Sequence, residues 1–337
     1  MDFAFLLVVS TPLILAALGE VVGQRGGVLN IGVEGMMLFG AFFGFLATGR
    51  SGSLLIGFGA AVLVGVVLAL ISGLFTVRLG ADQVVVGTAI NFLALGVTGL
   101  GFRRIYGQSG QLLSSPSLPH ALGIDPIVVI ALLLIPAIWF LLMKTNWGLA
   151  LRASGEYPKA VEAAGFSVSK VRISGLVLGG ALAGLAGAHL SLGVAGTFAE
   201  GMTAGRGFLA IALVTFGRWQ PIWVALAALL LGYTQSLQYS LQGNAISRHS
   251  VQITILLCCI ALAGTMMVKR KADLRVMGGI AILASLSFFS LSWPQEIHIP
   301  SQLWLALPYV LALLVLVLVG SGTLTPRALG KPYEKEA

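Results

Sequence analysis

Residues 54–77 read LLIGFGAAVLVGVVLALISGLFTV, with no charged side chain anywhere in the stretch. A transmembrane α-helix needs about 20 consecutive, mainly apolar residues, so this stretch is long enough to span a bilayer. A helix that is apolar on every side also has no face to turn toward water. The stretch therefore predicts a membrane-spanning helix.

The composition of the whole chain agrees with that prediction. Of its 337 residues, 57% are hydrophobic and only 9% are charged, whereas soluble domains carry about 25% charged residues. Such a chain cannot cover its own surface in water, which excludes a soluble enzyme, a disordered protein and a secreted disulfide scaffold. The only cysteines, Cys258 and Cys259, are adjacent in an apolar run. We interpret them as small buried residues rather than as metal ligands.

Further apolar segments recur along the chain, and each is expected to form a helix. They lie near residues 3–19, 31–48, 54–77, 84–102, 125–143, 173–194, 222–240, 251–268, 276–293 and 303–320, with a shorter segment near 204–217. The sequence lacks the alternating strands of about ten residues that outer-membrane barrels require. The predicted fold class is therefore all-α, a polytopic transmembrane helical bundle of about ten full spans plus one short segment.

The basic residues predict how this bundle is oriented. No Lys or Arg precedes Arg25, so the first segment lacks the basic start of a signal peptide and is expected to be retained. If residues 144–172 are cytoplasmic, most Lys and Arg residues, including Lys269–Lys271, fall on the cytoplasmic side as the positive-inside rule requires. This distribution holds only if the 204–217 segment crosses the membrane. The predicted topology has the N-terminus outside and the C-terminus inside.

The sequence contains no recognisable catalytic or cofactor motif. It has neither the H-E-x-x-H zinc motif nor the G-x-x-x-x-G-K-[ST] phosphate loop, and its four histidines are scattered. The net charge of +8 fits cytoplasmic loops, because no basic patch with interleaved aromatic residues indicates nucleic acid. We therefore expect a transport protein rather than a membrane enzyme, with no metal, no cofactor and no catalytic residue of its own.

Polar residues inside apolar segments are better guides to function, because each costs on the order of 3 kcal/mol at mid-bilayer. In GGVLNIGVEGMM, residues 26–37, Asn30 and Glu34 are four residues apart and share one face of a helix. Either these residues line a pathway between helices, or Glu34 pairs with a neighbouring helix and only fixes packing. Glu34 is identified as the only clear mid-membrane carboxylate.

Two other stretches carry polar or small residues of interest. In GADQVVVGTAIN, residues 80–91, Asp82 is interpreted as a helix N-cap. Asn91 lies two turns further on, away from water, so it must hydrogen-bond to another helix or to a solute. In segment 173–194, His189 is interpreted as structural. Glycines spaced four apart in the same segment favour a close crossing, within this chain or with a partner.

The largest polar stretch on the predicted cytoplasmic side is KTNWGLALRASGEYPKAVEAAGFSVSKVR, residues 144–172. Pro158 begins a short run that is compatible with a helix, because proline is favoured at the first helical position. The mixed charges of this run fit a solvated loop and equally fit a docking helix for a soluble partner. Residue patterns alone leave both alternatives open.

Several stretches in series resemble a known family. They are GVLNIGVEGMMLFGAF (27–42), GADQVVVGTAINFLALG (80–96), GLALRASGEYPKAVEAAGFSVSKVR (148–172), GFLAIALVTFGRWQP (207–221), LPYVLALLVL (307–316) and LGKPYEKE (329–336). Together they resemble the ATP-binding-cassette importer permeases of the branched-chain amino acid, ribose and nucleoside family, most closely its nucleoside or simple-sugar branch. The resemblance covers residues 10–245 and 300–337, in the same order.

The resemblance implies a role and a set of partners. Members of this family form the membrane channel of an importer in the cytoplasmic, or inner, membrane. They work with a second permease, here expected as a heterodimer partner, with an ATPase subunit that binds ATP, and with an extracytoplasmic solute-binding protein. The chain is therefore expected to carry nucleosides. The alternatives are a simple sugar such as ribose, a branched-chain amino acid or, from a different class, an ion-coupled secondary carrier.

The resemblance also implies two sets of site residues. Residues 155–165 are similar to the coupling helix that docks on the ATPase. The residues implied in that contact are Arg152, Glu156, Lys159, Glu162 and Gly165. Asn30, Glu34 and Asn91 fall in segments that resemble the lining of the translocation pathway. ATP binding is then expected to move the coupling helix and to switch the core between outward-open and inward-open states.

One region departs from the family pattern. Members of the family pass almost directly from the segment at 222–240 to the segment at 303–320. Here residues 249–300 supply two further apolar segments joined by KRKADLR. A hairpin of two spans leaves the topology after it unchanged. We therefore expect a single transmembrane permease domain over residues 1–337, with a cytoplasmic coupling stretch at 144–172 and a peripheral two-helix hairpin at 249–300.

Overall fold

The structure is a computed structural model and describes residues 3–107, 124–241, 246–247, 285, 296–297, 325–331 and 333. Its elements are α1 (Phe3–Arg25), α2 (Val33–Ser51), α3 (Leu54–Gly73), the π-helix η1 (Leu74–Arg78), α4 (Gln83–Tyr106), α5 (Pro126–Lys144), α6 (Asn146–Glu156), α7 (Pro158–Ala163), α8 (Val168–His189), the π-helix η2 (Leu190–Val194), α9 (Arg206–Phe216), α10 (Pro221–Leu241), β1 (Ile246–Ser247) and β2 (Glu296–Ile297).

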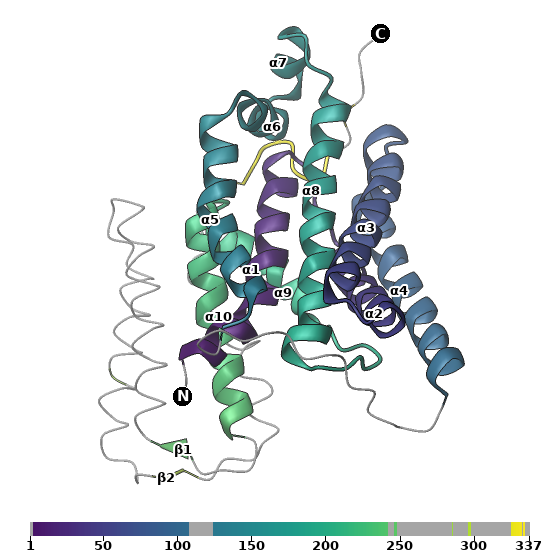
Figure 1. Ribbon diagram of the computed structural model, residues 1–337. Coiled ribbons are helices and arrows are strands. Elements are labelled where there is room, and N and C mark those ends of the chain that lie inside the picture. Colours follow the sequence, from purple (N-terminus) through teal and green to yellow (C-terminus); the bar gives the residue numbers. More distant parts are fainter. Residues whose placement is uncertain are drawn as a thin grey trace.

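The described part of the chain is a helical bundle, as the apolar segments predict (Figure 1). Its only strands are β1 and β2, which form one short antiparallel pair. Among the described residues, five helical stretches are long and apolar enough to cross a membrane, namely α1, α3 with η1, α4, α5, and α8 with η2. The predicted segments at 251–268, 276–293 and 303–320, and the hairpin at 249–300, lie outside the described residues apart from residues 285 and 296–297.

Local sequence signals set where several helices begin. The Asp82 carboxylate accepts hydrogen bonds from the backbone N–H groups of Val84 at 2.8 Å and Val85 at 3.1 Å. This confirms Asp82 as the N-cap of α4, because the carboxylate satisfies two backbone donors of the first turn. The short helix α7 begins at Pro158, as predicted. The proline costs nothing there, since the first N–H of a helix has no partner within the helix.

The centre of the bundle is α1, because 89% of its most apolar stretch is buried. Helix α8 packs against α1, α2 and α3, and α1 also packs against α9 and α10. Glycines make the α8 contacts close. A Cβ atom on Gly184 would lie 2.2 Å from the Ala61 carbonyl oxygen, and one on Gly19 would lie 2.8 Å from the Gly179 carbonyl oxygen. The predicted close crossing is therefore confirmed within this chain.

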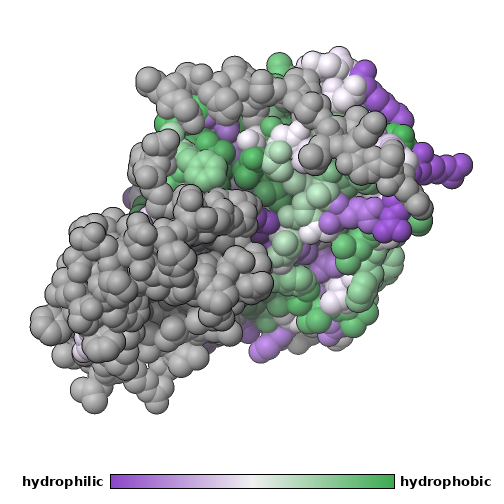
Figure 2. Space-filling view, turned by 90° about the horizontal axis from the view of Figure 1, so that it is seen from below, coloured by the Kyte–Doolittle hydropathy of each residue, from purple (hydrophilic) through white to green (hydrophobic). Residues whose placement is uncertain are grey.

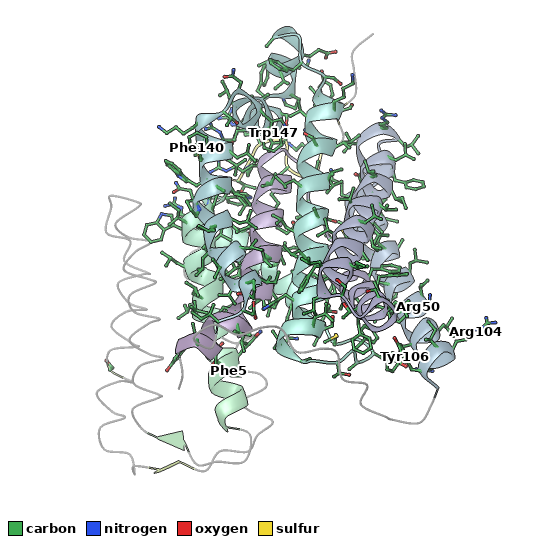
Figure 3. The ribbon with its side chains drawn as sticks, viewed as in Figure 1. Phe5, Arg50, Arg104, Tyr106, Phe140 and Trp147 are labelled. Atoms are coloured by element: carbon green, nitrogen blue, oxygen red, sulfur yellow. The ribbon has the colours of Figure 1, made fainter. Side chains whose placement is uncertain are left out.

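The bundle has two ends, which are formed by different parts of the chain. At one end lie the C-terminus of α1, the N-terminus of α8, α6 and α7, together with residues 325–331 (Figure 1, top). We call it the α6–α7 end. At the other end, the opposite end, lie the N-termini of α1 and α5 and the C-terminus of α8. Figure 3 shows Arg50, Arg104 and Tyr106 at the opposite end, and Trp147 near the α6–α7 end.

The short segment predicted near 204–217 forms α9. It has 11 residues and is therefore about 16 Å long, roughly half the thickness of a bilayer core. The chain leaves η2 at the opposite end. It reaches the α6–α7 end just after α9, where the Trp219 carbonyl accepts a hydrogen bond from Arg25 Nε at 2.8 Å. Helix α10 then returns along α1. The segment around α9 thus connects the two ends of the bundle.

Much of the bundle surface is apolar. Large exposed apolar side chains occur on α3, α4 and α5: Leu55, Leu63, Leu70, Phe92, Leu100, Leu133 and Phe140. Figure 3 shows Phe140 on the outer side of the bundle. Figure 2 shows the opposite end, with hydrophobic side chains over much of the coloured face and hydrophilic ones gathered toward one edge. Such a surface is suited to lipid contact, because lipid tails impose no penalty on exposed leucine or phenylalanine.

Candidate functional site

The sequence between α1 and α2 is unwound, and side chains of α4 hold its backbone. The Leu29 N–H donates to Gln83 Oε1 at 2.7 Å. Asn91 bonds both to this sequence and to the first turn of α2: its Nδ2 donates to the Ile31 carbonyl at 3.0 Å, and its Oδ1 accepts from the Gly35 N–H at 2.8 Å. These bonds satisfy backbone groups that the missing helical turns leave without partners. We call residues 26–32 the unwound segment.

Glu34 connects α2 to α9. Its two carboxylate oxygens accept hydrogen bonds from the Gly205 N–H at 2.8 Å and the Gly207 N–H at 2.6 Å. These N–H groups belong to the start of α9, where the helix dipole also favours a negative charge. A Cβ atom at Gly207 would lie 2.6 Å from the Glu34 backbone, so only glycine permits the approach. The contact corresponds to the packing alternative for Glu34.

Asn30 differs from Glu34 and Asn91 because part of its side chain is unsatisfied. The side chain is only 3% exposed, and its Nδ2 lies 3.4 Å from Met36 Sδ. Its Oδ1 has no hydrogen-bond partner in the described part of the chain. A buried carbonyl oxygen without a partner costs free energy unless another group satisfies it. Of the three predicted pathway residues, Asn30 is therefore the one that has an unsatisfied side-chain atom in the described part of the chain.

A second buried carboxylate corrects the sequence analysis, which identified Glu34 alone. Glu20 in α1 is 2% exposed and accepts a hydrogen bond from Gln24 Nε2 at 3.2 Å. Gln24 in turn accepts from Trp219 Nε1 at 2.9 Å. The apolar segment was ended at residue 19, which placed Glu20 outside it. The helix continues to Arg25, and the absence of proline or a glycine pair between residue 19 and Gly26 is the signal that could have found it.

At the α6–α7 end, α6 packs closely on the unwound segment. Ser154 Oγ donates to the Gly26 carbonyl at 3.0 Å, and a Cβ atom on Gly155 would lie 2.2 Å from the Arg25 carbonyl oxygen. Trp147 Nε1 donates to Ser174 Oγ at 2.9 Å, which ties α6 to α8. Helix α6 is therefore fixed against both α8 and the end of α1.

The predicted coupling residues lie on α6, on α7 and in the turn after α7, and differ in exposure. Glu156, Lys159 and Gly165 are exposed, whereas Arg152 and Glu162 are half-buried. Gly165 has a φ of +83°, a conformation that side-chain-bearing residues rarely adopt. The structure thus brings the five residues to one end of the bundle, where α7 projects furthest (Figure 1).

Glu162, one of the predicted coupling residues, also has a partner that the sequence did not indicate. Its carboxylate accepts a hydrogen bond from the Tyr333 hydroxyl. Both residues line a pocket of about 810 Å³ between the α3–α4 turn and the α7–α8 turn. Exposed apolar side chains surround this end, including Leu79, Phe166 and Tyr157, which is 63% exposed. Exposed apolar groups beside a polar rim are typical of a surface that binds another protein.

Two polar pairs at the opposite end were not predicted as sites. Arg103 donates two hydrogen bonds to Glu200, at 2.8 and 2.7 Å. His189 Nε2 and Asp125 Oδ2 lie 2.9 Å apart, and both side chains are fully buried. The latter contact agrees with the structural interpretation of His189. No sequence signal joins either pair, because their partners are 97 and 64 residues apart. Among the described residues, no three potential metal ligands form a group.

Comparison with known proteins identifies the chain's relatives. A sequence profile described as "Branched-chain amino acid transport system / permease component" matches residues 3–262. The putative glucose ABC transporter permease protein of Haloferax volcanii is 36% identical over 71% of this chain and 77% of its own length. The nucleoside ABC transporter permease protein NupC of Lactococcus lactis is 35% identical over 69% of this chain and 80% of its own.

A guanosine ABC transporter permease protein of Bacillus subtilis, NupQ, is 36% identical over 68% of this chain and 79% of its own length. No solved structure matches the chain at a significant level. Because the family profile covers most of the chain and the relatives align over more than two thirds of it, the resemblance noted in the sequence is confirmed.

Proposed function

This chain belongs to the branched-chain amino acid transport system permease family, and we propose that it is the permease of an ATP-driven importer for nucleosides. The relatives NupC and NupQ, named for nucleoside and guanosine transport, support the substrate class. The chain is a multi-pass protein of the cytoplasmic membrane and a transport subunit. The Haloferax relative, named for glucose, supports a sugar as the second candidate substrate. The family description leaves branched-chain amino acids as a third.

The α6–α7 end is proposed to face the cytoplasm. It gathers Arg25, Lys144, Arg152, Lys159 and Arg172 from five separate elements. Under the positive-inside rule, such a concentration of basic residues favours the cytoplasmic side. In this orientation the N-terminus is outside and the C-terminus inside, and the chain forms one permease domain of about ten spans plus the short α9 segment. The hairpin at 249–300 is proposed to lie at the periphery of that domain.

Helix α7 and the turn after it are proposed to bind the ATPase subunit. The support is the projection of α7 beyond the bundle, the exposed charges of Glu156 and Lys159, and the apolar side chains of Tyr157 and Phe166 beside them. Glu162 and Gly165 frame the pocket next to this surface. An ATPase seated there is placed to push on α6, which packs directly against the unwound segment.

The unwound segment is proposed to border the translocation pathway. Broken helices line solute sites in many transporters, because their free backbone groups and dipoles face the cavity. The observation that carries this assignment is the buried Oδ1 of Asn30, which has no partner in the described part of the chain. A nucleoside hydroxyl or base N–H can donate to it. Glu34 and Asn91 are proposed to keep the segment in shape beside the solute.

The remaining partners are proposed to be a second permease, as in a heterodimer, and an extracytoplasmic solute-binding protein. Two guanosine permease proteins of Bacillus subtilis both match this chain, which supports a pair of related permeases in one importer. The broad apolar surfaces of α3 and α4 offer room for such a partner within the membrane. ATP is proposed to bind the ATPase subunit and not this chain.

The experiment is purification of the tagged chain in mild detergent, with Lys159→Glu as a test variant and Arg104→Glu as a matched charge reversal at the opposite end. An ATPase and a second permease are expected to co-purify with the native chain and with the Arg104 variant. Much less ATPase is expected with the Lys159 variant. Purification of the native chain without any ATPase would reject the proposal and favour an ion-coupled carrier. Competition of labelled guanosine uptake by ribose, glucose or leucine would then rank the substrate classes.

A further inference from the structure

A short piece of chain near the C-terminus joins the predicted coupling elements to the unwound segment. We define the C-terminal strap as residues 325–331 together with Tyr333. In Figure 1 it is the yellow trace that crosses between α6 and α8 above the end of α1. Ala328 is buried within it, at 8% exposure. The strap follows the last predicted span in sequence, yet it packs against residues more than 150 positions earlier.

The middle of the strap bonds to two backbones at once. The Ala328 N–H donates to the Gly155 carbonyl of α6 at 2.8 Å, and the Gly330 N–H donates to the Gly27 carbonyl at 3.2 Å. Gly27 belongs to the unwound segment and has a φ of +88°. A Cβ atom there would lie 3.2 Å from the Ala328 carbonyl oxygen and 3.0 Å from Arg172 Nη2. The strap therefore lies between α6 and the unwound segment without space to spare.

Arg172 fastens one end of the strap. It is 2% exposed, and its Nη1 donates to the Lys331 carbonyl at 3.0 Å while its Nη2 donates to the Ser154 carbonyl at 3.0 Å. A planar guanidinium directs two donors in fixed directions, which a lysine cannot do. The side chain thus holds α8, α6 and the strap in one arrangement. Such a buried cation bonded to two carbonyls is costly unless all three parts stay together.

Tyr333 fastens the other end to α7. Its hydroxyl donates to the Glu162 carboxylate, and its ring forms part of the pocket beside α7. A hydrogen bond to a charged acceptor is stronger than one between neutral groups. Together with chain continuity and the buried Val161, this bond ties α7 to the rest of the end. A displacement of α7 therefore also displaces Tyr333, or breaks its hydrogen bond to Glu162.

We propose that Tyr333 and Arg172 are positioning residues for coupling, which fasten the C-terminal strap so that it passes displacement of α7 to the unwound segment. The inference rests on the proposed function, because it requires that an ATPase moves α7. It goes beyond that function in assigning transmission to the strap. The direct contact of Ser154 with Gly26 holds α6 in place but does not include α7. The route through Tyr333 begins on α7 itself.

The test uses the reconstituted complex of this chain with its ATPase, second permease and binding protein. Tyr333→Phe removes one hydroxyl and keeps the ring, so the fold is expected to persist. Tyr106→Phe, the same change at the opposite end, is the control. We expect Tyr333→Phe to lower the amount of solute moved per ATP hydrolysed by about tenfold, as loss of one charged hydrogen bond allows, with ATPase binding and hydrolysis retained.

A second readout separates transmission from simple structural support. In the native complex, ATP is expected to change the hydrogen-exchange rate of backbone amides in the unwound segment. In Tyr333→Phe that response is expected to disappear while exchange without ATP stays native. Arg172→Lys, which keeps the charge but not the paired donors, is expected to give the same loss.

Three outcomes would overturn the inference. Native transport per ATP in Tyr333→Phe would show that the strap transmits nothing. A parallel loss of ATPase binding and transport would show that Tyr333 serves docking alone. An equal effect of Tyr106→Phe would show that the loss is not specific to the strap. If the native chain binds no ATPase at all, the proposed function fails together with the inference, whereas the first three outcomes leave the proposed function intact.

Discussion

Helix α1 packs in one way along its length and is followed at its C-terminal end by a segment that is held in another way. Along its length it meets α8 through glycine, with Gly19 against Gly179 backbone to backbone. At its end, the unwound segment is held by side chains of α4, with Gln83 and Asn91 bonding to its peptide groups. The first contact has no space in which to move. The second also includes a close approach, because a Cβ atom on Gly87 would lie 2.7 Å from the Gly32 nitrogen, but it adds side-chain hydrogen bonds of about 1 kcal/mol each, which can be exchanged.

The comparison indicates where the molecule is rigid and where it can change. A glycine-packed contact has no alternative arrangement nearby, because interiors are close-packed and any shift produces overlap. A segment held by polar side chains can pass those bonds to a solute or to water at little net cost. We therefore expect α1 and α8 to move as one body, and the unwound segment to be the part that rearranges during transport.

The glycine contact is expected to be the most sensitive to substitution. Gly184→Leu would place side-chain atoms inside the Ala61 backbone, and we expect it to destabilise the protein by about 4 kcal/mol or more. The control is Gly59→Ala, at a position with nothing within 4 Å of the added Cβ, which is expected to be neutral or slightly stabilising. Thermal unfolding in detergent measures both. Equal melting temperatures would contradict the rigid-contact account.

Glu34 is expected to give the next largest effect. Glu34→Leu leaves the Gly205 and Gly207 N–H groups of α9 without an acceptor, and we expect a loss of about 3 kcal/mol. Glu34→Gln keeps one acceptor oxygen and is expected to lose about half as much. The two melting temperatures, measured side by side, check the order. If the Gln variant is the less stable, Glu34 acts through its charge and not as a cap.

Asn91 tests whether side chains of α4 maintain the unwound segment. Asn91→Leu removes the acceptor for Gly35 N–H and the donor to the Ile31 carbonyl, with an expected cost of about 2 kcal/mol. We also expect uptake to fall more than stability alone explains, because the segment loses its shape. Leu93, on the exposed face of α4, offers an apolar control as Leu93→Ala. Unchanged uptake in Asn91→Leu would reduce Asn91 to a packing residue.

The polar residues in and around the unwound segment could be found from the sequence, but not all their partners could. Polar residues stand out in an apolar stretch of sequence, so Asn30, Glu34 and Asn91 were identified. The contact of Glu34 with Gly205 joins positions 171 residues apart, and no local periodicity encodes it. Glu20 was missed because a hydropathy boundary was drawn one residue too early.

The fold, too, could be predicted in its local features but not in its long-range contacts. Segment 54–77 and its counterparts predicted the helices, because spanning a bilayer requires apolar length. Capping chemistry predicted the start of α4 at Asp82 and of α7 at Pro158. The arrangement of the helices was not predicted, apart from the close crossing of α8. The strap was missed entirely, since a backbone-to-backbone contact such as Ala328 with Gly155 depends on no particular side chain.

Substitution of Asn30 tests whether the unwound segment contacts solute, and its effect is expected on transport rather than on stability. Because its Oδ1 has no partner in the described part of the chain, Asn30→Ala is expected to change stability by less than about 1 kcal/mol. If Oδ1 bonds to solute, KM for uptake is expected to rise by about tenfold while the maximal rate changes little. Uptake kinetics in vesicles with the intact importer measure both. An unchanged KM would remove Asn30 from the pathway.

The smallest effect is expected at the opposite end, where the hydrogen bond from Arg103 lowers the pKa of Glu200. A carboxyl group with a lowered pKa in the folded protein adds stability above its ordinary pKa, and that stability is lost as pH falls through the folded value. We therefore expect a slight loss of stability on acidification that Glu200→Gln abolishes. Melting temperatures from pH 7 down to pH 3 (about one unit below the ordinary carboxyl pKa) measure it. An unaltered pH profile in the variant would exclude the pair as its source.

The central claim is that this chain moves solute only when an ATPase drives it through α7. The most direct measurement is uptake of labelled guanosine into liposomes that contain the purified importer, with and without ATP, using the native chain and Glu162→Arg. We predict uptake that requires ATP in the native importer, and ATP hydrolysis without matching uptake in the variant. Guanosine uptake by this chain alone, without ATP or an ATPase subunit, would contradict the account.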